Sequence, residues 1–129
     1  MTRAMPRLTA ALTILVFLHP IMAVRAQEAS AGTPAEISHL LNHIRKSDCM
    51  FVRNGVGYDG RIAAAFVQRK YESLQDKVRN AEDFILLVAT KSEESGKPYQ
   101  VRCPGRQAID ASRWLRIELQ SYLARANLE

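Results

Sequence analysis

The chain contains two cysteines, Cys49 and Cys103, and their pairing would constrain the fold more than any other feature of its 129 residues. An even number of cysteines in a protein that folds outside the cytoplasm favours a disulfide. Such a cross-link closes a loop of about 55 residues and stabilises the fold by about 4 kcal/mol in the chain-entropy model. Two free thiols or half of a metal site are the alternatives, but neither cysteine has a second one nearby to form a C-x-x-C motif. We therefore predict one disulfide.

The N-terminal segment has the pattern of a secretory signal peptide. Two arginines precede an uncharged run, Leu8 to Leu18, and the small residue Ala26 marks a cleavage site. The run is shorter than the roughly 20 residues that span a bilayer. The sequence thus predicts a signal peptide over 1–26, a flexible leader over 27–32 and a single helical domain over 33–129. We expect the mature protein in the periplasm or secreted.

Charge argues against a nucleic-acid partner, and the length of the apolar stretches argues against membrane insertion. The formal net charge is +5, but the predicted signal peptide carries three of the 18 basic residues and none of the 13 acidic ones. The mature chain then has 15 basic and 13 acidic residues, a net charge of +2. So small an excess gives no reason to expect nucleic-acid binding. No second apolar stretch reaches membrane length, so we expect no stable membrane insertion.

Hydrophobic periodicity predicts about four helices. The first begins at a T-x-x-E capping box, Thr33 to Glu36 with Pro34 in its first turn, and ends near Ser47. One buried stripe follows from its apolar spacing: Ile37, Leu40, Leu41 and Ile44.

The three further helices are less sharply bounded. A long helix is expected over 61–79, and Asn80 is the expected N-cap of the next. The apolar run 84–89 suits either a buried helix or a buried strand, and the acidic residues before it favour a helix. The last helix starts at about Asp110 and should turn five side chains inward: Trp114, Leu115, Leu119, Tyr122 and Leu123.

Two short segments, 49–53 and 99–103, have strand character. If Cys49 lies opposite Cys103 in an antiparallel pair, then Phe51 lies opposite Val101 and Arg53 meets Tyr99, all on one face. Between the first strand and the long helix, residues 54–60 are expected to form a glycine-rich loop. The predicted fold is therefore mainly α, with a short two-stranded antiparallel ribbon pinned by one disulfide.

Catalytic and metal-binding patterns are weak. His39 and His43 lie one turn apart with Glu36 nearby, but H-E-x-x-H is absent and a solvated helix face explains them as well. No G-x-S-x-G elbow is present, and the acidic pairs 82–83 and 93–94 are adjacent rather than one helical turn apart. We predict no catalytic residue, no metal and no cofactor, so that a binding protein is favoured over an enzyme.

Polar and aromatic residues cluster in the loops at the ends of the ribbon. Guanidinium, amide, hydroxyl and phenol groups together suit recognition of a glycan, a peptide or a protein. The alternative is that they are turn and cap residues, because Asn-Gly and Ser-Gly favour turns. The predicted binding residues are Arg53, Asn54, Tyr58, Ser92, Ser95, Lys97 and Tyr99.

Several strings in the chain resemble a known family. S-D-C-M-F-V-R-N-G (47–55), A-E-D-F-I-L-L-V-A-T-K-S-E-E-S-G-K-P-Y-Q-V-R-C (81–103) and S-R-W-L (112–115) are similar to the pattern of small exported bacterial proteins typified by YfeK. The resemblance covers nearly the whole mature chain. It implies a mostly helical, exported domain of unknown function with a cysteine pair, and it supplies no active site to carry over.

A shorter string, Ser95-Gly96-Lys97-Pro98-Tyr99, is similar to the S-G-x-x-Y loop of periplasmic lysozyme inhibitors. That resemblance implies that Ser95 contacts the lysozyme cleft and that Tyr99 supports it, although those inhibitors are β-barrels. The sequence thus favours a non-enzymatic module that binds an envelope protein or a cell-wall glycan or peptide. A lysozyme inhibitor and an enzyme acting on cell-wall material are the alternatives.

Overall fold

The computed structural model describes residues 2–5 and 33–128, and four helices account for most of the second segment. The helices are α1 (Thr33–Lys46), α2 (Gly60–Leu74), α3 (Ala81–Val88) and α4 (Ala111–Ala126), with a short 3₁₀ turn, η1 (Gln75–Lys77), after α2. Four strands complete the fold: β1 (Met50–Arg53), β2 (Val56–Tyr58), β3 (Gln100–Arg102) and β4 (Ile109–Asp110). The predicted leader and nearly all of the predicted signal peptide lie outside the described residues. Among the described residues, no helix is long and apolar enough to cross a membrane.

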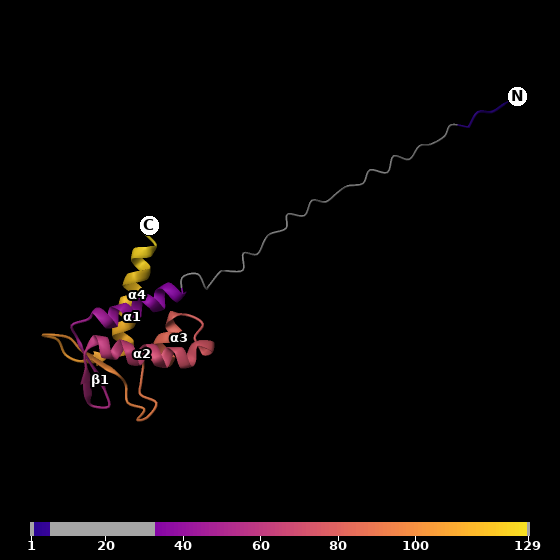
Figure 1. The fold of residues 1–129 in the computed structure, drawn as a ribbon. Helices are drawn as coiled ribbons and strands as arrows, with labels where there is room; N and C mark the ends of the chain where they lie inside the picture. The colour runs from indigo at the N-terminus through magenta and orange to yellow at the C-terminus, as the bar shows by residue number, and fades with distance from the viewer. Residues whose placement is uncertain (1, 6–32, 129) are drawn as a thin grey trace.

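The helices form the hydrophobic core, and the predicted stripe of α1 is confirmed. Its four buried residues are those expected: Ile37, Leu40, Leu41 and Ile44. The run 84–89 is helical up to Val88, and Phe84 is fully buried there. Asn80 caps α3 as predicted, since its side chain accepts a hydrogen bond from the Asp83 N–H at 2.8 Å. Leu123 was expected to face inward but is 38% exposed, because α4 extends beyond the core at its C-terminal end (Figure 1).

Helix α2 is shorter than predicted and lies very close to α1. It ends at Leu74, and η1 continues the chain toward Val78. At its start, the Asp59 side chain accepts a hydrogen bond from the Ile62 N–H at 3.0 Å. A Cβ atom on Gly60 would lie 2.2 Å from the Ile44 carbonyl oxygen, so glycine is required where α2 meets the end of α1.

The predicted ribbon forms the centre of a larger sheet. The order is β2-β1-β3-β4 and every pair is antiparallel. Phe51 lies opposite Val101, as the predicted register requires. The disulfide between Cys49 and Cys103 is present, with an S–S distance of 1.97 Å and a Cα–Cα distance of 4.1 Å.

Residues 54–60, expected to be a loop, instead contain strand β2. Asn54 and Gly55 have φ angles of 51° and 77°, and two consecutive positive φ angles are typical of the two-residue turn that joins hairpin strands. The chain therefore reverses at once, and β2 pairs with β1 along its length, from Arg53 opposite Val56 to Phe51 opposite Tyr58.

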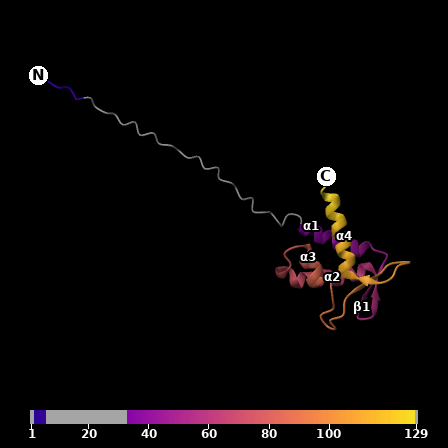
Figure 2. The same cartoon turned by 180° about the vertical axis from the view of Figure 1, so that it is seen from behind.

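The sheet lies at the end of the helical layer that is remote from the C-terminus, as both views show (Figures 1 and 2). The β1–β2 hairpin and the loop 91–98 extend from this end of the molecule on the same side. Segments far apart in the sequence thus meet beside the first strand, and the predicted binding residues lie among them.

Candidate functional site

Three of the predicted binding residues bond to one another. The Asn54 side-chain amide donates a hydrogen bond to Ser92 Oγ at 3.2 Å, and its oxygen accepts one from the Ser95 hydroxyl. Ser95 Oγ also accepts from the Lys97 N–H at 3.2 Å. Ser92 is fully buried. These polar groups hold the hairpin turn against the loop 91–98, which is the structural role that the sequence left as an alternative.

Backbone hydrogen bonds close the same loop. The Ser92 N–H donates to the Lys97 carbonyl at 3.0 Å, and the Gly96 N–H donates to the Ser92 carbonyl at 2.8 Å. Gly96 has a φ of 69°, which suits glycine at this tight turn. The loop that carries Ser95 and Lys97 is therefore a compact turn whose ends are bridged at Lys91 and Pro98.

The other predicted residues meet at a pocket. Arg53, Tyr58 and Tyr99 line a cavity of about 60 Å³ between the sheet and α2. Ser95 and Lys97 do not line it. Most of its wall is apolar and comes from all four helices, the residue after α3 and strand β1: Ile44, Phe51, Val52, Ala63, Phe66, Val67, Val88, Ala89, Ala111 and Leu115. Lys70 completes the lining.

Three cations lie over aromatic rings at or beside this pocket, and two of them, Arg53 and Lys70, line it. The guanidinium carbon of the third, Arg69, is 5.0 Å from the centre of the Phe66 ring, but Arg69 does not line the pocket. The Arg53 guanidinium carbon is 5.7 Å from the centre of the Phe66 ring, and Lys70 Nζ is 5.4 Å from the centre of the Tyr99 ring.

The register that pairs Val52 with Gln100 leads toward the predicted position of Arg53 opposite Tyr99, and both residues line the pocket. Helix α2 adds Phe66 as a ring partner of Arg53 and Lys70 as a cation partner of Tyr99. The Tyr58 ring packs edge-on against Phe66 at 5.2 Å. The cation-to-ring distances given above are all within the range of cation–π attraction, which extends to about 6 Å.

Exposed carboxylates lie near the two cations that line the pocket, Arg53 and Lys70. Glu94 Oε2 lies 3.5 Å from Arg53 Nη2, and Glu93 Oε1 lies 3.4 Å from Lys70 Nζ. The Lys70 ammonium also donates to the Lys91 carbonyl at 2.9 Å. Lys70 was not predicted to belong to the site. The only sequence signal for it was its position one helical turn after Phe66, which places both side chains on one face of α2.

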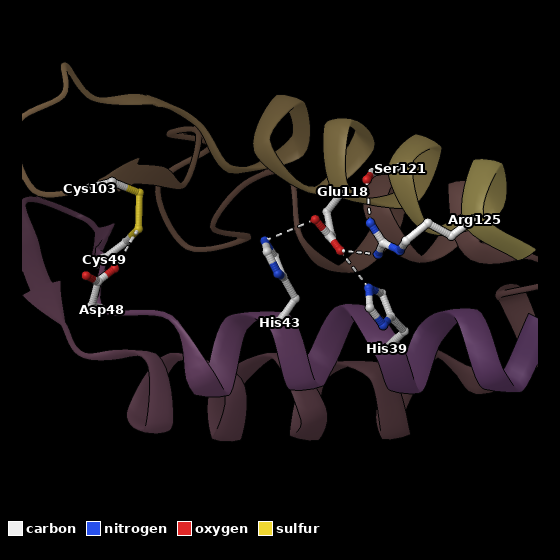
Figure 3. A network of polar contacts seen from close by, with 8 residues as sticks. All are labelled: His39, His43, Asp48, Cys49, Cys103, Glu118, Ser121 and Arg125. Carbon is white, nitrogen blue, oxygen red and sulfur yellow. Dashed lines mark hydrogen bonds and ion pairs between the residues drawn. A yellow bond between two sulfur atoms is a disulfide. The ribbon is translucent and has the colours of Figure 1, made fainter.

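A second polar cluster joins α1 to α4 (Figure 3). His39 and His43 extend from α1 toward Glu118 of α4. His39 Nε2 lies 2.7 Å from Glu118 Oε1, and His43 Nε2 lies 3.8 Å from Oε2. Arg125 Nη2 is 3.2 Å from the same Oε1 and its Nη1 donates to Ser121. Since an ionised carboxylate can only accept hydrogen bonds, Nε2 of His39 is the donor.

The cluster shifts the pKa values of two of its members. Burial lowers the pKa of His43 below its ordinary value; Glu118 opposes this, and the charges of His39 and Arg125 reinforce it. Burial alone would raise the pKa of Glu118. The hydrogen bond from His39 and the charge of His43 outweigh burial, together with Arg125, so the net shift is downward. At neutral pH this favours an ionised Glu118 beside an uncharged His43.

Aromatic rings cover the two histidines. The His39 ring stacks on Tyr122 with centres 4.1 Å apart, and the His43 ring lies 4.2 Å from Trp114. The carboxylate beside the histidines is that of Glu118 rather than Glu36, which sequence proximity had suggested. Within the described part of the chain, no group of three or more His, Cys, Asp or Glu side chains is arranged to hold a metal ion.

Comparison with known proteins identifies relatives without assigning a function. Residues 31–123 match DUF5329, described as a family of unknown function. The chain is also 31% identical over 96 residues to the uncharacterised protein YfeK of Salmonella typhimurium strain LT2, an alignment that covers 74% of this chain and 77% of YfeK. No solved structure gives a significant match.

Proposed function

Because the chain belongs to DUF5329, a family of unknown function, we propose from its own site that it is a non-enzymatic binding module of the bacterial envelope. The ligand enters the pocket lined by Arg53, Tyr58 and Tyr99. One observation carries this proposal: a largely apolar cavity opens beside two cations that lie over aromatic rings. Apolar cavities with a few convergent polar groups are the usual form of ligand sites.

The proposed location rests on two features. The disulfide between Cys49 and Cys103 indicates an extracytoplasmic protein, because such bonds persist in oxidising compartments. The signal-peptide pattern of residues 1–26 supports periplasmic or secreted localisation. N-terminal sequencing of the exported protein should find Gln27 as the first residue, and an uncleaved chain would contradict this part of the proposal.

The pocket is a better candidate than the loop 91–98. Lysozyme inhibition through Ser95 would use a hydroxyl that already bonds to Asn54 and to the Lys97 N–H. Cell-wall hydrolysis through Glu93 and Glu94 would use two exposed carboxylates that are each beside a cation. Both alternatives are still measurable, as slowed lysozyme turnover and as product released from peptidoglycan.

The test is capture of envelope components by the oxidised mature chain, analysed by mass spectrometry of proteins and muropeptides. Arg53→Ala removes a cation of the pocket, whereas Lys97→Ala removes an exposed cation that does not line it. We expect a partner captured by the wild type and by Lys97→Ala and lost with Arg53→Ala. Equal capture by all three proteins would contradict a site at the pocket. Loss with Lys97→Ala alone would assign binding to the loop.

A further inference from the structure

The chain supplies its own anions to the cations at the pocket. Glu93 and Glu94 are consecutive residues of the loop 91–98; the first approaches Lys70 and the second approaches Arg53, at 3.4 and 3.5 Å. Both cations line the pocket, whereas neither carboxylate does. Two negative charges therefore lie beside the two cations that line the cavity, but outside the cavity itself.

The glutamates are weakly held in these two ion pairs. Strong charge-assisted hydrogen bonds have lengths of about 2.7–2.9 Å, shorter than either pair. The side chains of Glu93 and Glu94 are 73% and 77% exposed, so water competes for them and each retains much of its rotamer freedom. The cations are less exposed, with 18% for the Lys70 side chain and 36% for the Arg53 side chain. An incoming anion could replace the carboxylates while the cations stay in place.

We propose that the pocket binds a peptide in which an acidic group lies next to an apolar side chain, and that Glu93 and Glu94 occupy the position of that acidic group in the free protein. This rests on the proposed function of the pocket. The apolar side chain enters the cavity, and the carboxylate of the ligand replaces one or both glutamates at Arg53 and Lys70. Arg53 can bind a carboxylate through two nitrogens, which adds directionality to the attraction.

The size of the cavity favours a peptide side chain over a lipid chain. A volume of about 60 Å³ has room for about four to six water-sized groups, comparable with the four carbons of one leucine side chain. An acyl chain of a membrane lipid would need a longer channel. The loop 91–98 also shows that a peptide backbone can present carboxylates to both cations at once.

Three small peptides test the two parts of the ligand separately in NMR titrations of the oxidised mature chain. Acetyl-Leu-Glu-amide carries both the apolar and the acidic group, acetyl-Leu-Gln-amide lacks the charge, and acetyl-Gly-Glu-amide lacks the apolar side chain. Binding should shift the resonances of residues that line the pocket, above all Tyr58, Phe66 and Tyr99. We expect the first peptide to bind more tightly than either of the others.

The decisive variant is Glu93→Gln/Glu94→Gln, which removes both internal anions at exposed positions. It should bind acetyl-Leu-Glu-amide about three- to tenfold more tightly than the wild type, because exposed ion pairs of this kind contribute little each. Its affinity for acetyl-Leu-Gln-amide should not change. The matched control is Glu72→Gln/Asp76→Asn, which removes two exposed charges that do not line the pocket.

The outcomes separate this inference from the proposed function. If wild type and Glu93→Gln/Glu94→Gln bind the acidic peptide equally, replacement of the glutamates is wrong, while pocket shifts with the peptide still support a binding site. An equal gain in the control variant would assign the effect to overall charge and also overturn the inference. If no peptide shifts the pocket resonances, the peptide inference fails, while the proposed function is still decided by the capture experiment with Arg53→Ala. Binding of decanoate without binding of the peptides would replace the peptide by a fatty-acid ligand.

Discussion

Two clusters of charged side chains in this protein use similar groups and hold them in opposite ways. At the pocket, Glu93 and Glu94 are about three-quarters exposed and each approaches a single cation at 3.4–3.5 Å. Between α1 and α4, the Glu118 side chain is 19% exposed and contacts His39 at 2.7 Å and Arg125 at 3.2 Å. Burial and the number of donors, rather than charge type, therefore separate a loosely held ion pair from a structural one.

Removal of the disulfide should lower the stability of the whole domain, and with it the stability of both clusters. In Cys49→Ser/Cys103→Ser we expect a loss of about 4 kcal/mol of unfolding free energy, because the loop that the bond closes becomes free in the unfolded chain. For a domain of this size that corresponds to a fall in Tm of more than about 10 °C, measurable by circular dichroism. Wild-type protein under reducing conditions is the control. A variant as stable as the oxidised wild type, or two free thiols found by mass spectrometry in the native protein, would contradict the structure.

Truncation of one glutamate from each cluster tests the comparison directly. Glu118→Ala removes a half-buried acceptor and leaves His39 and Arg125 without it, so we expect a cost of about 1.5–3 kcal/mol in chemical denaturation. Glu94→Ala should change the unfolding free energy by less than about 0.5 kcal/mol. Glu118→Gln, which keeps an acceptor oxygen, should lie between them. Equal costs for the two alanine variants would show that the clusters do not differ in the way proposed.

Acidification should loosen the α1–α4 cluster in two stages. The pKa of His43 is lower in the folded chain than its ordinary value of 6.5, so the unfolded chain binds the proton more readily. Stability is therefore full above about pH 6.5 and falls as the pH drops through that value toward the folded pKa. Glu118 also has a lowered pKa, so its stabilising contribution is present above its ordinary value of 4.5 and is lost as the pH falls through its folded pKa.

The measurement is Tm as a function of pH for the wild type and for His43→Gln. The variant should lack the first decline and keep the second. A wild-type curve that rises between pH 6.5 and 5 would show that the sign assigned to His43 is wrong.

The smallest effect is expected from Glu93→Gln/Glu94→Gln in the absence of ligand. Because both side chains are largely exposed, the free energy of unfolding should change by less than about 0.5 kcal/mol. Because salt screens exposed charges, this small difference should become smaller still at high salt. A large loss of stability would mean that these glutamates hold the loop 91–98 in place, and that they are not available for replacement by a ligand.

Local sequence signals predicted much of the fold. The buried stripe of α1, the Asn80 cap and the alignment of Phe51 with Val101 each depend on residues close in sequence or on the period of a strand. Strand β2 was missed although Asn54–Gly55 is a common hairpin signal, because Val56–Tyr58 is short and contains a glycine. The exposed end of α4 was missed because periodicity shows which face is apolar, not where the core ends.

The candidate site was predicted in part. Arg53, Tyr58 and Tyr99 line one pocket, whereas Asn54, Ser92 and Ser95 bond to one another. Composition could not separate these roles, since an amide or a hydroxyl suits both a turn and a ligand. Lys70 and Glu118 were missed because each acquires its role only when helices pack, and no short-range pattern specifies which face of α2 or α4 meets which partner.

The cross-link between Cys49 and Cys103 divides the chain into a covalent ring and two arms. Arg53, Lys70, Glu93 and Glu94 all lie within the ring, while every histidine, carboxylate and arginine of the α1–α4 cluster lies on an arm. A protease that cuts once inside the ring therefore leaves one molecule of unchanged mass apart from an added water, until the bond is reduced. A single cut between Cys103 and α4 would instead leave that helix without a covalent link to the ring, attached through packing and contacts such as those of Glu118 with His39 and of Arg116 with Glu82.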